Sequence, residues 1–205
     1  DVALAVGTEL GPTDYDMYER GAGAVPPLIR IDIDPLQAQR NATPALALAG
    51  DAGATLSALT SALGRRAPGE GAARAEAVRR AARAGIGASY LRMVEMLETV
   101  RETLPGARIV GDSTQMVYAG NLWHAAPARR HWFNAATGYG ALGYGLPAAI
   151  GAQLADPASP VVCLLGDGGL QFSAGELAAA VEAGTPVIVL LWNNRGYGEI
   201  KGFME

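Results

Sequence analysis

Short apolar runs alternate with stretches of helical periodicity along the whole chain. The runs have the length of strands and are nearly continuous in apolar residues; they cover residues 1–6, 28–34, 107–111, 160–165 and 186–192. Helical patterns fill residues 51–63, 72–84, 93–104, 147–150 and 173–183. Fully apolar strands separated by helices are typical of a parallel sheet that is covered on both faces. We therefore expect an α/β fold with a parallel sheet flanked by helices.

A stretch rich in glycine, proline and charge divides the chain. Residues 64–71 read Gly-Arg-Arg-Ala-Pro-Gly-Glu-Gly and interrupt the alternation, as a linker does. We expect residues 1–63 to end one domain, residues 64–85 to be a linker with an Ala/Arg-rich helix, and residues 86–205 to form a second domain. The chain has no initiator Met and starts inside a strand pattern. We also expect it to be a piece of a longer protein, truncated near its C-terminal end.

Composition and charge exclude several classes of protein. The 205 residues carry a formal net charge of -4, so no excess of positive charge favours binding to nucleic acid. No apolar stretch approaches the roughly 20 residues that cross a bilayer, and we expect no membrane partner. Cys163 is the single cysteine, and its apolar surroundings in the sequence predict a buried small hydrophobe. One thiol forms no internal disulfide, which favours a reducing cytoplasm.

Two of the expected strands end in polar residues that suit a metal ion and a phosphate group. Gly166–Gly169 follows one strand, and Asn193–Asn194 follows the next. Ligands of parallel sheets bind beyond the carboxyl ends of the strands. The Asp167 carboxylate and the Asn194 amide oxygen are donors that Mg²⁺ or Ca²⁺ takes, and glycines let backbone N–H groups approach an anion. A diphosphate bridged by Mg²⁺ satisfies both sets of groups, although each motif taken separately also fits a tight turn or a strand-end cap.

The two motifs together resemble the signature of thiamine-diphosphate-dependent enzymes. Gly-Asp-Gly at 166–168 is separated from Asn-Asn by 24 residues, the length that one strand–helix–strand unit needs. Residues 137–151 resemble the preceding segment in the group that contains acetolactate synthase, benzoylformate decarboxylase and pyruvate oxidase. Residues 1–63, including Ile31–Pro35, resemble the end of that group's Rossmann-like middle domain. The resemblance implies a thiamine-diphosphate-binding fold that part of a Rossmann-like domain precedes.

The resemblance assigns roles to eleven residues. It implies metal ligands at Asp167 and Asn194 through their side chains and at Gly196 through its carbonyl. It implies that a further set lines the diphosphate: Ser113, Thr114, Gly168, Gly169, Tyr197 and Gly198. Leu142 is implied to lie under the bent cofactor, although it is also an acceptable core residue, and the Gly140 carbonyl to accept from the aminopyrimidine. The implied cofactors are thiamine diphosphate and Mg²⁺.

The activity of the complete enzyme is also implied by the resemblance. We expect decarboxylation of a 2-oxo acid, or carboligation, in a homodimer or homotetramer, with the cofactor as electron sink. An activating glutamate is implied to come from the pyrimidine-binding domain of a neighbouring subunit, so we expect no catalytic residue in this chain and no activity of this chain alone. Residues 7–14 and 111–115 together resemble most a 5-guanidino-2-oxopentanoate (2-ketoarginine) decarboxylase, which implies that substrate.

Two alternatives stay open for the function. The first is acetolactate synthase, although its usual Gly-Gln-His is replaced here by Asp112–Thr114. The second belongs to another class: a non-catalytic module that keeps the fold and the cofactor site. A nicotinamide dehydrogenase is disfavoured because the chain lacks the G-x-G-x-x-G fingerprint.

Two pairs of residues give weaker signals. Asp32 and Asp34 at a strand end could bind a ribose, and some members of the family hold FAD or ADP in the middle domain. Without the glycine fingerprint we favour a structural strand end, so FAD is possible but not supported. His124 and His131 are the only histidines and could line a substrate pocket with two nearby tryptophans. A partly buried position in a loop is the favoured interpretation.

Overall fold

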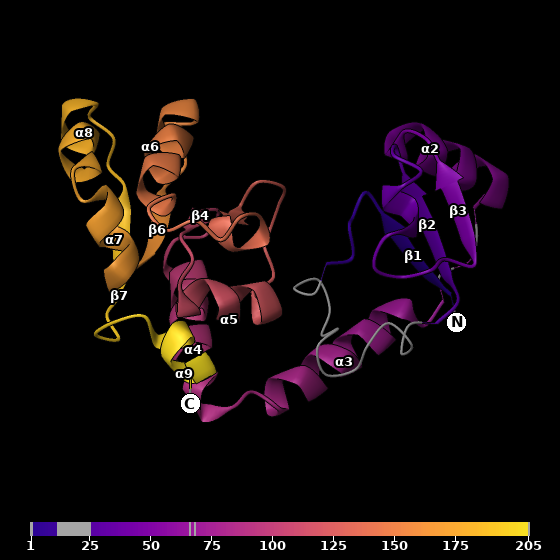
Figure 1. The fold of residues 1–205 in the computed structure, drawn as a ribbon, viewed down its shortest axis with the longest axis horizontal. Coiled ribbons are helices and arrows are strands. Elements are labelled where there is room, and N and C mark those ends of the chain that lie inside the picture. Colours follow the sequence, from indigo (N-terminus) through magenta and orange to yellow (C-terminus); the bar gives the residue numbers. More distant parts are fainter. Residues whose placement is uncertain (1, 12–25, 66, 68, 205) are drawn as a thin grey trace. The chain divides into compact units, whose positions relative to one another are not determined.

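The computed structural model describes residues 2–11, 26–65, 67 and 69–204. The chain divides into two compact units, Asp1–Ala72 and Ala73–Glu205. Each unit contains its own parallel sheet (Figure 1), which confirms the expected α/β class. Among the helices of the described residues, none has the length and apolar character needed to cross a membrane.

The first unit is built on a three-stranded parallel sheet. Its strands are β1 (Ala3–Val6), β2 (Leu28–Asp32) and β3 (Leu46–Ala49), in the order β1-β2-β3. The short 3-10 helix η2 (Gln37–Gln39) lies between β2 and β3, and the helix α2 (Ala52–Leu63) follows β3. Asp51 caps α2 by accepting a hydrogen bond from the Ala54 N–H at 2.8 Å, and Gly64 ends it. The predicted helix over 51–63 is therefore confirmed.

The strand β2 is shorter than the apolar pattern predicts. The pattern continues to Asp34, but the strand ends at Asp32. Oδ1 of Asp32 accepts from the Asp34 N–H at 3.0 Å, and Oδ1 of Asp34 accepts from the Leu36 N–H at 2.8 Å. Each carboxylate thus closes a local turn, as expected for a structural strand end. The strand β3 was not predicted from the sequence. Its four residues include two alanines and are mostly exposed, so they give no strong apolar pattern.

The second unit carries a four-stranded parallel sheet. Strands β4 (Arg108–Gly111), β5 (Trp132–Asn134), β6 (Val161–Gly166) and β7 (Ile188–Trp192) pair in the order β5-β4-β6-β7. The helices from residue 71 onward are α3 (Gly71–Ala84), α4 (Ala88–Thr103), α5 (Gln115–Trp123), α6 (Gly145–Ala155), α7 (Asp167–Ser173), α8 (Glu176–Glu182) and α9 (Gly198–Met204). The 3-10 helix η3 (Ala135–Thr137) follows β5. The apolar pattern misses β5 because this strand is only three residues long.

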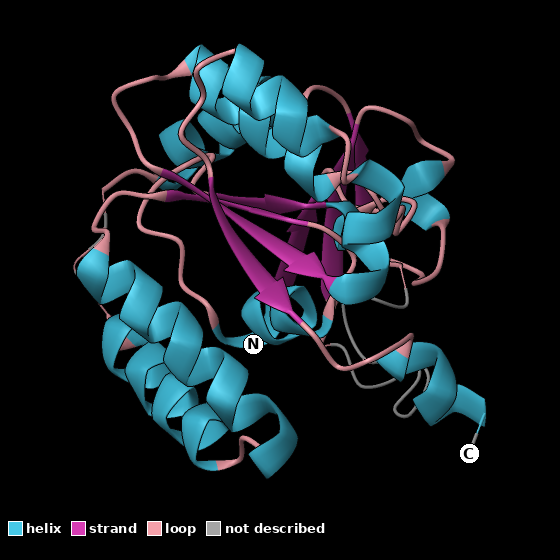
Figure 2. Ribbon diagram, turned by 90° about the vertical axis from the view of Figure 1, so that its left-hand side faces the viewer, coloured by secondary structure: helices cyan, strands magenta, loops and turns pink. Residues whose placement is uncertain are grey.

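Both faces of this sheet are buried at its central strands β4 and β6, which explains the continuous apolar run of β6. Val162 and Leu164 of β6 pack with residues of α4 and α5. The alternating Val161 and Cys163 pack with residues of α6 instead. Helices accordingly flank the sheet on both sides (Figure 2). Cys163 is fully buried, as predicted, and burial, followed by the nearby charge of Asp112, raises the pKa of its thiol to about 12.

Two of the predicted helices have different limits in the structure. The pattern predicts one helix over 173–183, but α7 and α8 are separate helices with Ala174 and Gly175 between them. Asp167 is the first residue of α7, so the Gly-Asp-Gly-Gly motif leads from β6 directly into a helix. The helix α6 begins at Gly145 rather than at Pro147. Proline is tolerated in a first helical turn because the N–H that it lacks has no partner there.

Candidate functional site

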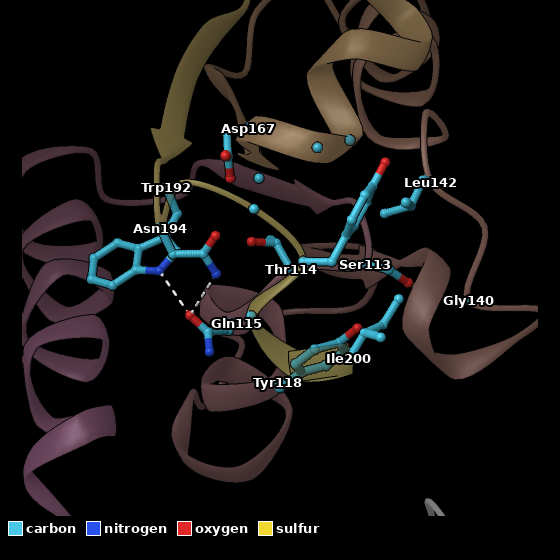
Figure 3. Close-up of a pocket in the computed structure, with 16 residues that line it drawn as sticks. Ser113, Thr114, Gln115, Tyr118, Gly140, Leu142, Asp167, Trp192, Asn194 and Ile200 are labelled. Carbon is cyan, nitrogen blue, oxygen red and sulfur yellow. Dashed lines mark hydrogen bonds between the residues drawn. The ribbon is translucent and has the colours of Figure 1, made fainter. Parts of the chain in front are cut away.

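A cavity of about 260 Å³ lies at the carboxyl ends of β4, β6 and β7. Because these strands are parallel, the segments that follow them meet at one edge of the sheet (Figure 3). All eleven residues that the resemblance singled out line this cavity. Five further residues complete the lining: Gln115, Tyr118, Gly166, Trp192 and Ile200. The structure therefore brings the whole predicted set together, and the role of each member in binding a cofactor stays a proposal.

Close packing requires glycine at two positions of the lining. A Cβ at Gly168 would lie 2.9 Å from Cε1 of Tyr197. A Cβ at Gly169 would lie 3.1 Å from Oδ2 of Asp112. The first turn of α7 can approach both neighbours only because these two residues lack side chains. This wall of the cavity is consequently backbone, as an anion-binding wall requires.

The end of β4 presents an unpaired hydroxyl at the cavity. Ser113 Oγ is buried and has no hydrogen-bond partner in the part of the chain that the structure describes. Buried polar groups nearly always have a partner, so a ligand with acceptor oxygens would suit this hydroxyl. A Cβ on Gly140 would lie 3.6 Å from it, which places the two residues next to each other. Thr114 follows and makes no capping hydrogen bond to α5 through its side chain. Both hydroxyls fit a diphosphate.

Oxygen donors of three kinds come to the same cavity. Asp167 contributes a carboxylate, Asn194 an amide oxygen and Gly196 a backbone carbonyl. Within the described ranges, no group of three or more His, Cys, Asp or Glu side chains could hold a metal ion. The three oxygen donors of the lining leave coordination positions of a hard cation open to water or to the oxygens of a ligand. Proteins commonly hold Mg²⁺ in this way, with one or two carboxylates and the phosphates of a bound ligand.

Asp112 anchors the glycine-rich segment 138–145, a role that the sequence analysis did not assign. It directly follows β4 and is fully buried. Its Oδ1 accepts from the Ser113 N–H at 2.7 Å. Its Oδ2 accepts from the N–H groups of Gly143 at 2.8 Å and Gly145 at 3.3 Å. An acid placed immediately after an apolar strand is the signal that would have identified it.

Gln115, the first residue of α5, is a second residue to which no role was assigned. Its Oε1 accepts from Nε1 of Trp192 and from Nδ2 of Asn194, both at 3.1 Å (Figure 3). The contacts join positions 77 and 79 residues apart. No local pattern signals them, because they depend on which strand ends meet in the folded sheet.

The two histidines lie away from the cavity. His124 follows α5 and is half-buried; its ring lies against that of Trp132, with centroids 4.8 Å apart. Burial, and then the charge of Arg101, lowers the pKa of His124. Nδ1 of His131 lies 3.3 Å from the Ala107 carbonyl oxygen. Both histidines are partly buried loop residues, as favoured from the sequence, and neither lines the cavity.

Comparison with known proteins places the cavity in a recognised domain. Residues 110–205 match the family described as "Thiamine pyrophosphate enzyme, C-terminal TPP binding domain". The chain is 42% identical over 211 residues to the probable 2-ketoarginine decarboxylase of Pseudomonas aeruginosa, an alignment that covers 100% of this chain and 37% of that protein.

Acetolactate synthases match a smaller part of the chain. The large subunit from Haemophilus influenzae is 35% identical over 112 residues, and that of isozyme 3 from Escherichia coli is 36% identical over 111 residues. Each alignment covers 54% of this chain and 19% of the relative. The chain thus spans well under half the length of the curated relatives that it matches.

Proposed function

We propose that the cavity binds thiamine diphosphate together with Mg²⁺ and that the intact protein is a 2-oxo acid decarboxylase or carboligase, since residues 110–205 match the C-terminal TPP-binding domain of the thiamine pyrophosphate enzymes. The observation that carries this proposal is the convergence of the eleven residues on one cavity at the ends of parallel strands. The chemistry of the lining supports it. An unpartnered hydroxyl, close-packed glycines and three oxygen donors suit a diphosphate held through a hard cation.

In this proposal the metal ion is held by Asp167 and Asn194 through their side chains and by Gly196 through its carbonyl. The diphosphate lies against Ser113, Thr114, Gly168, Gly169, Tyr197 and Gly198. The carboxylate of Asp167 by itself would repel a diphosphate. A cation between the two groups removes this repulsion, which is why the proposal requires the metal and the cofactor together.

Leu142 and Gly140 are proposed to contact the organic part of the cofactor. Leu142 is half-buried in the lining and belongs to neither core cluster, which favours contact with a ligand over a core role. The Gly140 carbonyl is proposed to accept from the aminopyrimidine. Bound thiamine diphosphate supplies the electron sink for cleavage between the carboxylate and the carbonyl carbon of a 2-oxo acid. The residues of this chain bind and orient it.

A second subunit is proposed to complete the site. Among the described residues of the lining, Asp167 is the only carboxylate, and it is assigned to the metal. An acid that activates the pyrimidine must then come from elsewhere, which supports a pyrimidine-binding domain on a neighbouring subunit of a homodimer or homotetramer. A single buried cysteine supports the cytoplasm as the location of the protein.

We propose 5-guanidino-2-oxopentanoate (2-ketoarginine) as the substrate. The relative named for this activity matches all of the chain, whereas the two acetolactate synthases match 54% of it. The segment 111–115 that favoured this substrate lines the site with three of its residues. The other segment, 7–14, lies in the first unit, and residues 12–14 fall outside the described residues. Acetolactate synthesis from pyruvate is the second candidate, because the two acetolactate synthases are 35% and 36% identical to this chain over 54% of its length.

Binding is tested first, by calorimetry of the intact protein. We expect thiamine diphosphate to bind in the presence of Mg²⁺, and neither thiamine diphosphate in EDTA nor NAD to bind. Asp167→Ala should remove measurable binding because the cation loses its only carboxylate ligand. Asp156→Ala is the matched control, since Asp156 pairs with Arg108 at 2.7 Å outside the cavity. Equal affinity of the wild type in EDTA and in Mg²⁺ would contradict the proposed metal site.

Turnover is tested second, by CO₂ release from 2-ketoarginine beside acetolactate formation from pyruvate. We expect cofactor-dependent release from 2-ketoarginine at roughly 1 per second or more. Faster reaction with pyruvate and formation of acetolactate would identify the second candidate. Tight cofactor binding without turnover of any 2-oxo acid would instead identify a non-catalytic module.

A further inference from the structure

The side-chain amide of Asn194 can face the cavity in two ways. A half-turn about its last bond exchanges the oxygen and the NH₂ group, which have nearly the same shape but opposite hydrogen-bonding character. Only one orientation gives a cation an oxygen; the other gives it two N–H donors. Asn194 is exposed, so burial does not choose between the two orientations.

A neighbouring tryptophan makes that choice. Indole Nε1–H can donate but cannot accept. Trp192 Nε1 lies 3.1 Å from the end of the Gln115 side chain, which must therefore present its oxygen, Oε1. The same oxygen lies 3.1 Å from the Asn194 amide, which must then present its NH₂ group. The Asn194 oxygen is left on the opposite side, away from Gln115 (Figure 3).

The parts of this arrangement are held by packing. Trp192 packs against the core cluster that contains Leu164, and Gln115 opens α5, whose next residue, Met116, is fully buried. A Cβ on Gly198 would lie 2.5 Å from Asn194 Nδ2 and 3.3 Å from Gln115 Nε2. Gly198 therefore lies against both amides, and a side chain at this position would displace them. Within the described residues, Asn194 Oδ1 accepts no hydrogen bond.

The same unit contains a second arrangement of this kind. Trp132 Nε1 donates to Asn121 Oδ1 at 2.8 Å, and Asn134 Nδ2 donates to the same oxygen at 3.0 Å. The Asn134 oxygen is thereby directed away from Asn121, and it accepts from the Ala136 N–H at 3.0 Å. In this case the role of the oriented oxygen is known from the structure, because the Asn134 side chain caps η3. In this second arrangement, the hydrogen bonds therefore fix the direction of an asparagine side-chain oxygen.

We infer that Trp192 and Gln115 are positioning residues that hold the Asn194 amide with its oxygen toward the metal site. The inference rests on the proposed function, since the orientation matters only if Asn194 ligates a cation. Loss of the indole donor would let Gln115 turn its own NH₂ group toward Asn194, and the Asn194 oxygen would then turn away from the cation.

The test is calorimetric titration of Mg²⁺ into the intact protein with thiamine diphosphate present, which reads metal affinity rather than activity. Trp192→Phe keeps an aromatic ring and removes the donor, and should weaken Mg²⁺ binding about 3- to 10-fold, the effect of one hydrogen bond. Gln115→Leu should do the same. Gln115→Glu, which offers only acceptor oxygens to both partners, should retain the affinity.

Two controls separate orientation from general damage. Trp132→Phe removes the same kind of hydrogen bond from the second arrangement and should leave Mg²⁺ affinity unchanged. In an Asn194→Asp background, Trp192→Phe should have no further effect, because a carboxylate presents an oxygen in either orientation. Equal affinities for Trp192→Phe and Trp132→Phe, or an undiminished effect of Trp192→Phe in the Asn194→Asp background, would overturn the inference alone. A wild-type protein that binds no Mg²⁺ with the cofactor would overturn the proposed function and the inference together.

Discussion

Several residues around the cavity are notable for a group that is missing: a hydrogen-bond partner or a side chain. Ser113 has a buried hydroxyl without a partner, and Gly168 and Gly169 have no side chain where one would collide with a neighbour. Leu142 brings an apolar side chain to the lining without joining either core cluster. None of these features adds to the stability of the fold, and each of them suits contact with a ligand. Such local conflicts are expected at functional sites.

Leu142 and Leu146 allow a matched test of ligand contact against core packing. Leu146 is fully buried in a core cluster, so Leu146→Ala should cost about 2–5 kcal/mol of unfolding free energy. Leu142→Ala should cost about 1 kcal/mol or less and should lower turnover roughly 10- to 100-fold by misplacing the cofactor. Thermal melts and turnover assays on the intact protein measure both. A large drop in melting temperature for Leu142→Ala, with cofactor-saturated turnover intact, would reject the proposed contact.

His124 should make the fold sensitive to mild acid. Burial lowers its pKa in the folded protein from the ordinary value of 6.5, so between the two pKa values the unfolded chain binds more protons. The contribution of the neutral ring is present above pH 6.5 and is lost as the pH falls through the lowered pKa. We expect wild type to lose more stability than His124→Phe, which cannot be protonated, between pH 7.5 and 5.5. Parallel denaturant titrations of the two proteins would show equal losses if His124 were not responsible.

Asp112 holds the C-terminal end of the segment between η3 and α6. Asp112 accepts hydrogen bonds from the N–H groups of Gly143 and Gly145, where the chain enters α6. A Cβ at Gly145 would lie 2.9 Å from the Asp112 backbone nitrogen, so α6 begins in direct contact with the end of β4. The loop that carries Gly140 and Leu142 is consequently tied to the sheet near one end.

Removal of this tie should affect both stability and binding. Asp112→Ala leaves three N–H groups, those of Ser113, Gly143 and Gly145, without this acceptor and should cost about 2–4 kcal/mol, with weaker binding of thiamine diphosphate because the loop is released. Asp51→Ala is the control: it removes the cap of α2 in the first unit and should cost about 1 kcal/mol without any effect on the cofactor. Denaturant titration and calorimetry measure both quantities. If Asp112→Ala resembled Asp51→Ala in both, the anchoring role would be wrong.

At the scale of the whole molecule, the proposed function gives this chain the diphosphate and metal side of the site and assigns the other side to a second domain. The alignment with the 2-ketoarginine decarboxylase relative covers all of this chain but only 37% of that protein. Among the described residues of the lining, Asp167 is the one carboxylate, and in the proposed function it is a ligand of the metal ion.

The 205-residue chain alone is therefore expected to be inactive. Incubated with thiamine diphosphate, Mg²⁺ and either 2-ketoarginine or pyruvate, it should release no CO₂ above the level without protein, because no acid is left to activate the cofactor. The intact protein in the same assay is the positive control. Cofactor-dependent release by the chain itself at roughly 1 per second would show that its own residues complete the site.

The sequence by itself determined the class of fold and the members of the site. Strands buried on both faces must be apolar at every position, so β6 could be predicted from its run alone. The edge strand β7 was predicted from an equally apolar run, although its residues are only partly buried or exposed. Asp167 and Asn194 follow those strands, and parallel strands bring their carboxyl ends to one edge. Shorter elements such as β3 and β5 escaped prediction because they bury too little surface to leave a pattern.

Only the tertiary structure decided how the polar side chains are oriented. The contact of Gln115 with Trp192 spans 77 positions, and that of Asp112 with Gly143 spans 31. Hydrophobic periodicity records which face of an element is buried, but not which donor meets which acceptor. That pairing depends on the order and register of the strands and on a few ångströms of space next to glycines. It exists only once β4, β6 and β7 lie side by side.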